Sequence, residues 1–138
     1  MRKGRVILAD KHPNVLGGIR RLLEAEVESV LMVSDEISLM HALEHHNPDV
    51  VIADLSLPVS TKTNIAWQLK EKFPQIKVVI LSNYGDKSVV DDVLASGVEG
   101  FVLKQRAVID LIPAIRSVRQ GLKYISPDEF ETVDPEAR

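Results

Sequence analysis

Five short runs of Val, Ile and Leu place the strongest constraint on how this chain can fold. Most of these runs do not alternate with polar residues, which is typical of strands buried on both faces of a parallel sheet. The runs are RVILA (5–9), SVLMV (29–33), DVVIA (49–53), KVVIL (77–81) and GFVL (100–103). We therefore predict a five-stranded parallel sheet.

The segments between these runs carry apolar residues at helical spacing. Asp35 is a candidate N-cap for the second helix, and Asp110 for the last one, which would put Pro113 in its first turn. Strand and helix thus alternate five times, which predicts a single doubly wound (βα)5 domain of the α/β class with helices on both faces. The predicted helices cover residues 13–25, 36–46, 63–73, 87–96 and 108–120.

Length, charge and composition limit the domain organisation and the partners that we expect. The 138 residues are enough for one domain with a core, and we place it at 1–121, with 122–138 as a polar C-terminal tail or linker remnant. The net charge of −3 argues against DNA binding by this chain. The sequence has no cysteine and no apolar run long enough to span a membrane, so we expect no membrane partner and a cytoplasmic protein.

Four polar residues follow four of the predicted strands. They are Asp10, Asp54, Ser82 and Lys104. Because the carboxyl ends of parallel strands meet at one edge of the sheet, we expect these side chains to share a crevice. A carboxylate can act as a nucleophile towards a phosphoryl group, an ammonium can neutralise phosphoryl oxygens, and a hydroxyl can donate a hydrogen bond to them. The pattern therefore indicates phosphoryl chemistry.

This arrangement resembles the receiver domain of bacterial two-component response regulators. The resemblance covers residues 5 to about 121 and rests on ADKHP, DLSLP, GVEGFVLK and GLKYISP. It is closest to the CheY-like receivers that are usually linked to a helix-turn-helix DNA-binding domain. The resemblance implies a flavodoxin-like strand order 2-1-3-4-5 and a role in phosphorelay signal transduction.

The resemblance also implies a role for individual residues. Asp54 would accept a phosphoryl group from a sensor histidine kinase, Lys104 would pair with the phosphoryl oxygens, and Ser82 would engage them and move on activation. Phe101 matches the aromatic switch position. A protein of this kind assists its own phosphorylation and is not a multi-turnover enzyme. Its output partner is not named by the sequence, and homodimer formation is implied only by resemblance.

A departure from the family pattern concerns the metal site. Asp10, Asp54 and the backbone carbonyl of Ser56 match ligands of Mg2+, but Lys11 stands where the family has a further acid. Asp10, Lys11 and Asp54 sum to a charge of −1, so the attraction for a dication is weakened. Lys11 either supplies part of the metal's positive charge inside the pocket or lies on the surface. Asp10 itself could instead be a simple helix cap.

Three other interpretations remain open. The first is a degenerate receiver that acts as a phosphorylation-independent protein-interaction module, favoured by Lys11 and by Lys62 in place of a loop glycine. The second is an aspartate-nucleophile phosphatase, which would normally show Asp-x-Asp after the first strand. The third is a metal site at His41 and His45, which lie four residues apart on a predicted helix without a third ligand.

Overall fold

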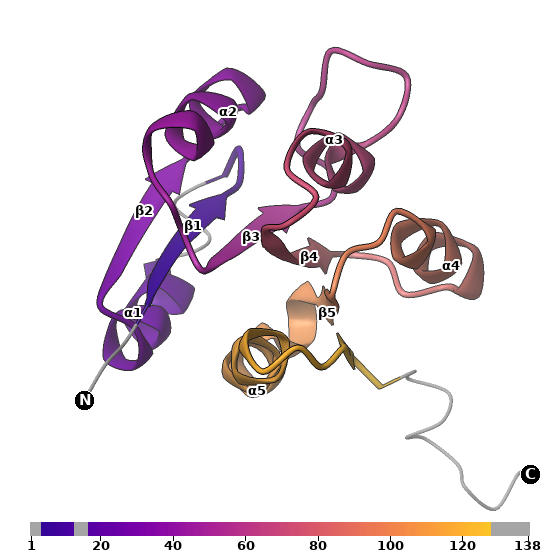
Figure 1. Ribbon diagram of the computed structural model, residues 1–138. Coiled ribbons are helices and arrows are strands. Elements are labelled where there is room, and N and C mark those ends of the chain that lie inside the picture. Colours follow the sequence, from indigo (N-terminus) through magenta and orange to yellow (C-terminus); the bar gives the residue numbers. More distant parts are fainter. Residues whose placement is uncertain (1–3, 13–16, 128–138) are drawn as a thin grey trace, which may run out of the picture.

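The computed structural model describes residues 4–12 and 17–127, and it contains one parallel sheet. The strand order is β2-β1-β3-β4-β5-β6 (Figure 1). The predicted order of the first five strands is confirmed, but the predicted count of five is wrong. The sixth strand pairs in parallel with β5 through Gly100 opposite Tyr124 and Phe101 opposite Ile125. The strands are β1 (Arg5–Ala9), β2 (Ser29–Val33), β3 (Val50–Asp54), β4 (Lys77–Ser82), β5 (Gly100–Leu103) and β6 (Tyr124–Ile125).

Helices cover both faces of the sheet, as the doubly wound prediction requires (Figure 1). Two of them, α1 and α5, pack on one face, and α2, α3 and α4 pack on the other. A short 3₁₀ helix, η2 (Lys104–Arg106), joins β5 to α5. The α-helices are α1 (Gly17–Glu26), α2 (Glu36–His45), α3 (Ile65–Lys72), α4 (Lys87–Ala95) and α5 (Ala107–Arg119). Within the described residues, no helix is both long and apolar enough to span a membrane.

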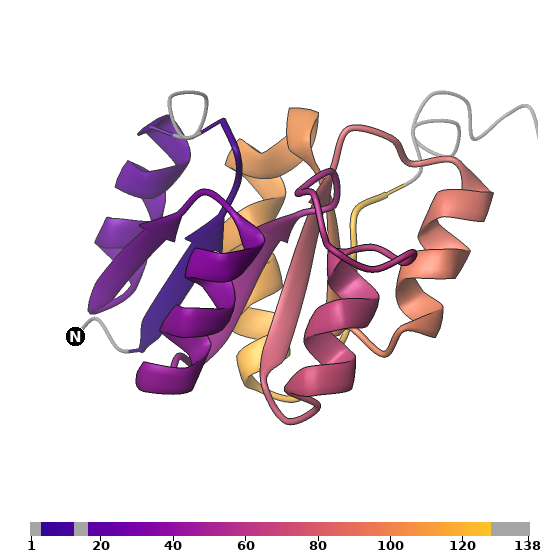
Figure 2. The ribbon, with the colours of Figure 1, turned by 90° about the horizontal axis from the view of Figure 1, so that it is seen from above.

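The core lies on the two faces of the sheet, and alternate residues of each strand serve opposite faces. In β3, Val51 and Ala53 pack with α2 and α3, whereas Val50 and Ile52 pack with α1 and α5. All five residues of β3 are buried, which explains why its sequence is a continuous apolar run that ends in an acid. The carboxyl ends of the parallel strands lie along the upper edge of the molecule in Figure 2.

Side chains cap the N-termini of α2 and α3. The Asp35 carboxylate accepts a 2.7 Å hydrogen bond from the Ser38 N–H, which confirms it as the N-cap of α2. The Asn64 side chain caps α3 by accepting from the Ala66 and Trp67 N–H groups. The first four residues of the helix predicted at 13–25 lie outside the described residues.

The predicted range of the last helix is close to the observed one, but the predicted N-cap role of Asp110 is wrong. The α5 helix begins at Ala107, so Asp110 lies within its first turn and Pro113 lies inside the helix. Asp110 is buried, and Arg106 donates to its carboxylate from Nε at 2.8 Å. The carboxylate therefore serves a tertiary contact and does not cap the helix.

Candidate functional site

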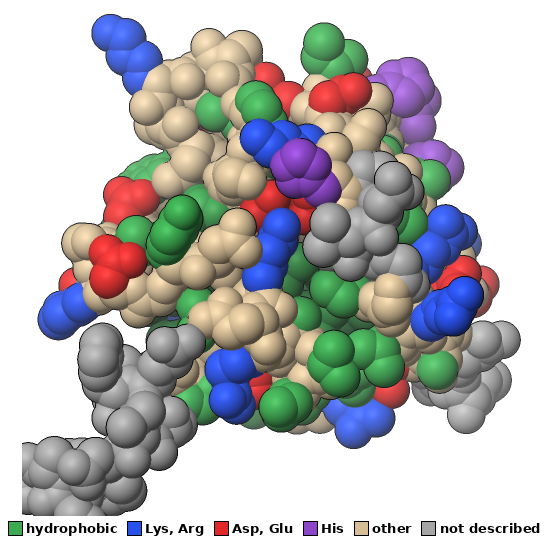
Figure 3. Space-filling view, turned by 180° about the vertical axis from the view of Figure 1, so that it is seen from behind, with side chains coloured by type: hydrophobic (Ala, Val, Ile, Leu, Met, Phe, Trp, Pro, Cys, Tyr) green, Lys and Arg blue, Asp and Glu red, His purple; other side chains and the backbone are tan. Residues whose placement is uncertain are grey.

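The structure brings the four predicted polar residues to the carboxyl edge of the sheet. Asp10 follows β1, Asp54 and Ser82 end β3 and β4, and Lys104 follows β5. Register places Asp54 opposite Leu81, one residue before Ser82, and pairs Ser82 with Leu103. Figure 3 looks onto this edge, where acidic, basic and histidine side chains meet near the centre.

A single ammonium group holds the two acids. Lys104 Nζ lies 2.9 Å from Asp10 Oδ2 and 3.2 Å from Asp54 Oδ2. Both aspartates are 1% exposed, so their charges depend on this partner. Burial lowers the pKa of Lys104, but the close contact with Asp10 and the charge of Asp54 outweigh it and raise the pKa above its ordinary value. Lys104 is therefore a fixed positive charge at the site.

The carboxylate of Asp54 is oriented by the residue two positions later. Ser56 donates from Oγ to Asp54 Oδ2 at 2.7 Å and from its backbone N–H to Oδ1 at 3.3 Å. Oδ2 is thus engaged by a hydroxyl and an ammonium, whereas Oδ1 has only the longer backbone contact. A pocket of about 100 Å³ opens beside Asp54, between Ser56 and the segment Ser82 to Tyr84. The less engaged oxygen is the one available to a reacting group.

The Ser82 hydroxyl contacts the backbone of its own loop. It donates to the Tyr84 carbonyl at 2.7 Å and accepts from the Tyr84 N–H at 3.0 Å. Tyr84 is 71% exposed, and Phe101, the predicted switch residue, is completely buried. The loop after β4 is therefore held by a hydroxyl that also lines the pocket beside Asp54.

Asp10 lies within this site, beside Lys104. Its Oδ1 accepts a 2.8 Å hydrogen bond from the His12 N–H. Its buried Oδ2 accepts no hydrogen bond of good geometry and has the ion pair with Lys104. Lys11 is exposed, so its ammonium does not fill the pocket, and Lys104 supplies the charge that we had considered for Lys11.

The oxygen donors suit a hard cation such as Mg2+, although they are few. Two carboxylates and a backbone carbonyl from Asp10, Asp54 and Ser56 are the ligand types that Mg2+ takes, with water in its other positions. The buried Asp10 Oδ2, which lacks a hydrogen bond, is an acceptor of the required kind. Among residues 4–12 and 17–127, no group of three His, Cys, Asp or Glu side chains is placed to hold a metal, and His41 and His45 instead stack with ring centroids 4.2 Å apart.

A buried acid at the end of the third strand, paired with a lysine after the fifth, is the arrangement that the resemblance to receiver domains led us to expect in this doubly wound sheet. The chain belongs to the family described as the response regulator receiver domain, whose model matches residues 6–116. It is therefore a receiver domain of two-component signalling, as the sequence motifs indicated.

Its relatives are transcriptional regulators. The chain is 33% identical over 127 residues to the transcriptional regulatory protein DegU of Brevibacillus brevis, covering 91% of this chain and 54% of DegU. It is 34% identical over 130 residues to the transcriptional regulatory protein RcsB of Escherichia coli strain K12, covering 90% of this chain and 60% of RcsB. The chain thus spans little more than half the length of these relatives.

A solved structure corrects one expectation from the sequence. RcsB from Salmonella enterica serovar Typhimurium, bound to the promoter P1flhDC with the phosphomimetic BeF3−, matches with a TM-score of 0.76 and 33% identity, covering 92% of this chain and 64% of that one. The expectation of no DNA binding, drawn from an acidic net charge, is therefore wrong for this family. The charge of a receiver does not report on a DNA-binding surface elsewhere in a regulator.

Two contacts of buried acids were not predicted from the sequence. The Ser56 side chain orients Asp54, whereas only its backbone carbonyl was predicted to contribute. The second is a buried network at Asp110, for which the sequence does hold a signal. Asp110 falls beside Leu111 and Ala114 on the core-facing stripe of α5, where an acid requires a partner.

Proposed function

We propose that Asp54 accepts a phosphoryl group from a sensor histidine kinase and that this switches a partner-binding surface. The observation that carries the proposal is the buried Asp54 carboxylate, 3.2 Å from the Lys104 ammonium and beside a small pocket that Ser82 also lines. We place this switch in the cytoplasm of a bacterium.

The chemistry follows from the contacts of each oxygen. Asp54 Oδ1 forms the new bond to phosphorus while the bond from phosphorus to the donor, a histidine nitrogen in a kinase, breaks and its electron pair leaves with the donor. Lys104 neutralises charge on the phosphoryl oxygens without a large rearrangement, because it already lies at Asp54. The Ser82 hydroxyl turns from Tyr84 to donate to a phosphoryl oxygen, which frees the loop after β4.

Mg2+ would be held by Asp10, Asp54 and the Ser56 carbonyl, and when bound it supplies positive charge to the phosphoryl oxygens. Lys104 stabilises Asp10 and Asp54 against mutual repulsion in the absence of a metal. Asp54 is the acceptor in a single transfer, so the domain is a switch and not a turnover enzyme. By similarity to DegU and RcsB, the output of the switch is the regulation of transcription through DNA.

The test is intact-protein mass after incubation with acetyl phosphate, with and without Mg2+. We expect a phosphoryl adduct on the unmodified protein and none on Asp54→Ala. Asp86→Ala is the matched control, because Asp86 is an acid at the start of α4 that does not line the pocket beside Asp54. No adduct from acetyl phosphate or from a phosphorylated kinase would refute the proposal and favour the degenerate interaction module. An adduct that persists in Asp54→Ala would refute Asp54 as the acceptor.

A further inference from the structure

Ser126 fastens the segment that leaves α5 to the outer edge of the sheet. Its backbone N–H donates to the Phe101 carbonyl at 2.8 Å. Its hydroxyl accepts from the Leu103 N–H at 3.0 Å and donates to Asp110 Oδ2 at 2.7 Å. Ser126 is 7% exposed, so these three bonds are shielded from water. They hold β6 against β5 although β6 has only two residues.

Asp110, which accepts the hydrogen bond from the Ser126 hydroxyl, is itself buried and accepts further hydrogen bonds. Asp110 is 2% exposed and accepts from Arg106 Nε at 2.8 Å and from the Tyr124 hydroxyl at 2.9 Å. Burial raises the pKa of Asp110, but the hydrogen bonds from Arg106, Ser126 and Tyr124 outweigh it and lower the pKa. Two of these donors lie in the segment after α5, so the acid serves to fix that segment. We call Arg106, Asp110, Tyr124 and Ser126 the exit clasp.

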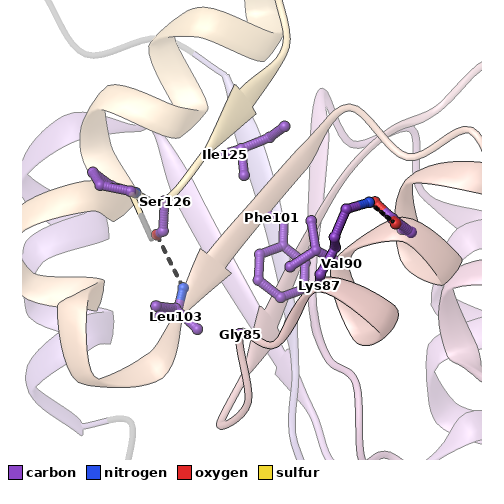
Figure 4. A pocket seen from close by; sticks show the side chains of 9 residues that line it. Gly85, Lys87, Val90, Phe101, Leu103, Ile125 and Ser126 are labelled. Carbon is purple, nitrogen blue, oxygen red and sulfur yellow. Dashed lines mark hydrogen bonds and ion pairs between the residues drawn. The ribbon is translucent and has the colours of Figure 1, made fainter. Parts of the chain in front are cut away.

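Leu103 connects the exit clasp to the phosphoacceptor site. Its N–H donates to Ser126, and the next residue is Lys104, which pairs with Asp54. Its side chain lies against Gly85 in the loop after β4, where an added Cβ would come within 2.7 Å of Leu103 Cδ2. Figure 4 shows Leu103 between Gly85 and Ser126 in a groove of about 400 Å³. The loop after β4, which Ser82 holds, and the exit clasp therefore both contact Leu103.

We propose that the exit clasp couples phosphorylation of Asp54 to the docking of residues 122–127. This inference rests on the proposed function and specifies how phosphorylation of Asp54 is transmitted to the end of the domain. Phosphorylation draws Lys104 towards the new oxygens and releases the loop after β4 when Ser82 turns. Both changes displace Leu103 relative to Ser126 and loosen the clasp. In a longer regulator, the segment that follows the exit clasp is reoriented as a result.

The first experiment is amide hydrogen exchange on the whole chain, before and after acetyl phosphate treatment, with the adduct confirmed by mass. Loss of about one hydrogen bond from the clasp predicts exchange at Tyr124 to Ser126 that is about fivefold to tenfold faster. Unchanged or slower exchange in protein that carries the adduct would overturn the coupling and leave the proposed function standing. Absence of the adduct would contradict both the coupling and the proposed function.

The second experiment uses thermodynamic reciprocity. If phosphorylation loosens the clasp, loosening the clasp must favour the phosphorylated state by the same factor. Ser126→Ala should therefore bind beryllofluoride about fivefold more tightly, and Ser126→Thr, which retains the hydroxyl, should bind it as the unmodified protein does. A clasp with only a structural role predicts equal or weaker binding.

Ser96→Ala is the matched control for that experiment, because the Ser96 hydroxyl donates to the Val93 carbonyl at the end of α4 and is not part of the exit clasp. Its beryllofluoride affinity should be unchanged. An equal gain in Ser96→Ala would overturn the inference, since the effect would then follow from general destabilisation. Tyr124→Phe, which removes one donor to Asp110, should shift the affinity in the direction of Ser126→Ala if that variant does not fold.

Discussion

Replacing Lys104 with methionine tests how the two buried acids are held. Methionine keeps the shape of the lysine stem but leaves Asp10 and Asp54, each 1% exposed, without their ammonium partner. Removing one member of a buried ion pair costs about 3–5 kcal/mol. The Lys104 side chain is 15% exposed, and water can partly solvate the acids. We therefore expect a loss of about 2–4 kcal/mol in the free energy of unfolding.

The assay is urea unfolding at neutral pH, followed by circular dichroism and by the fluorescence of Trp67, the only tryptophan. The matched control is Lys87→Met, which removes an exposed ion pair with Asp91 and should leave the free energy of unfolding almost unchanged. The double variant Asp10→Asn with Lys104→Met should recover at least about 1 kcal/mol relative to additivity. A Lys104→Met loss no larger than the control, or strict additivity, would refute this reasoning.

Four further predictions follow from single contacts. The folded-state pKa of Lys104 is raised, so its contribution to stability is present below the ordinary lysine pKa of about 10.4 and is lost above it. The urea midpoints of the unmodified protein and Lys104→Met should therefore converge above about pH 10.4. The pKa of Asp110 is lowered, so its contribution to stability is present above about pH 3.9 and is lost as the pH falls below that value. The difference in the free energy of unfolding between the unmodified protein and Asp110→Asn should therefore shrink below that pH in acid unfolding curves. Lys11→Asp restores an acid beside the site and should tighten Mg2+ binding about tenfold in calorimetric titration, whereas an unchanged affinity would separate position 11 from the metal site. Asn64→Ala removes the acceptor for two N–H groups of α3 and should cost about 1 kcal/mol in thermal unfolding.

Much of the site could be predicted because its residues end continuous apolar runs. Asp54 and Ser82 each follow a strand that is buried on both faces, and parallel connections bring such ends to one edge. The sequence does not specify side-chain direction beyond the strand. Position 11 could therefore be assigned either to the pocket or to the surface, and the structure leaves Lys11 exposed.

The sixth strand could not be predicted from its own residues. Tyr124 and Ile125 form a pair too short to give a strand pattern, and their place is set by tertiary hydrogen bonds through Ser126 and Asp110. The same contacts explain why the predicted N-cap role of Asp110 is wrong. An acid followed three residues later by proline suggests an N-cap, but here the acid binds a segment more than ten residues away in sequence.

The central claim, that Asp54 is the phosphoacceptor, is tested most directly by locating the phosphoryl group. Acetyl phosphate-treated protein would be reduced with borohydride, which converts an aspartyl phosphate to homoserine, and then digested and sequenced by mass spectrometry. The account predicts homoserine at position 54 and nowhere else in the unmodified protein. Homoserine at Asp10 or at another acid, with position 54 unchanged, would contradict it.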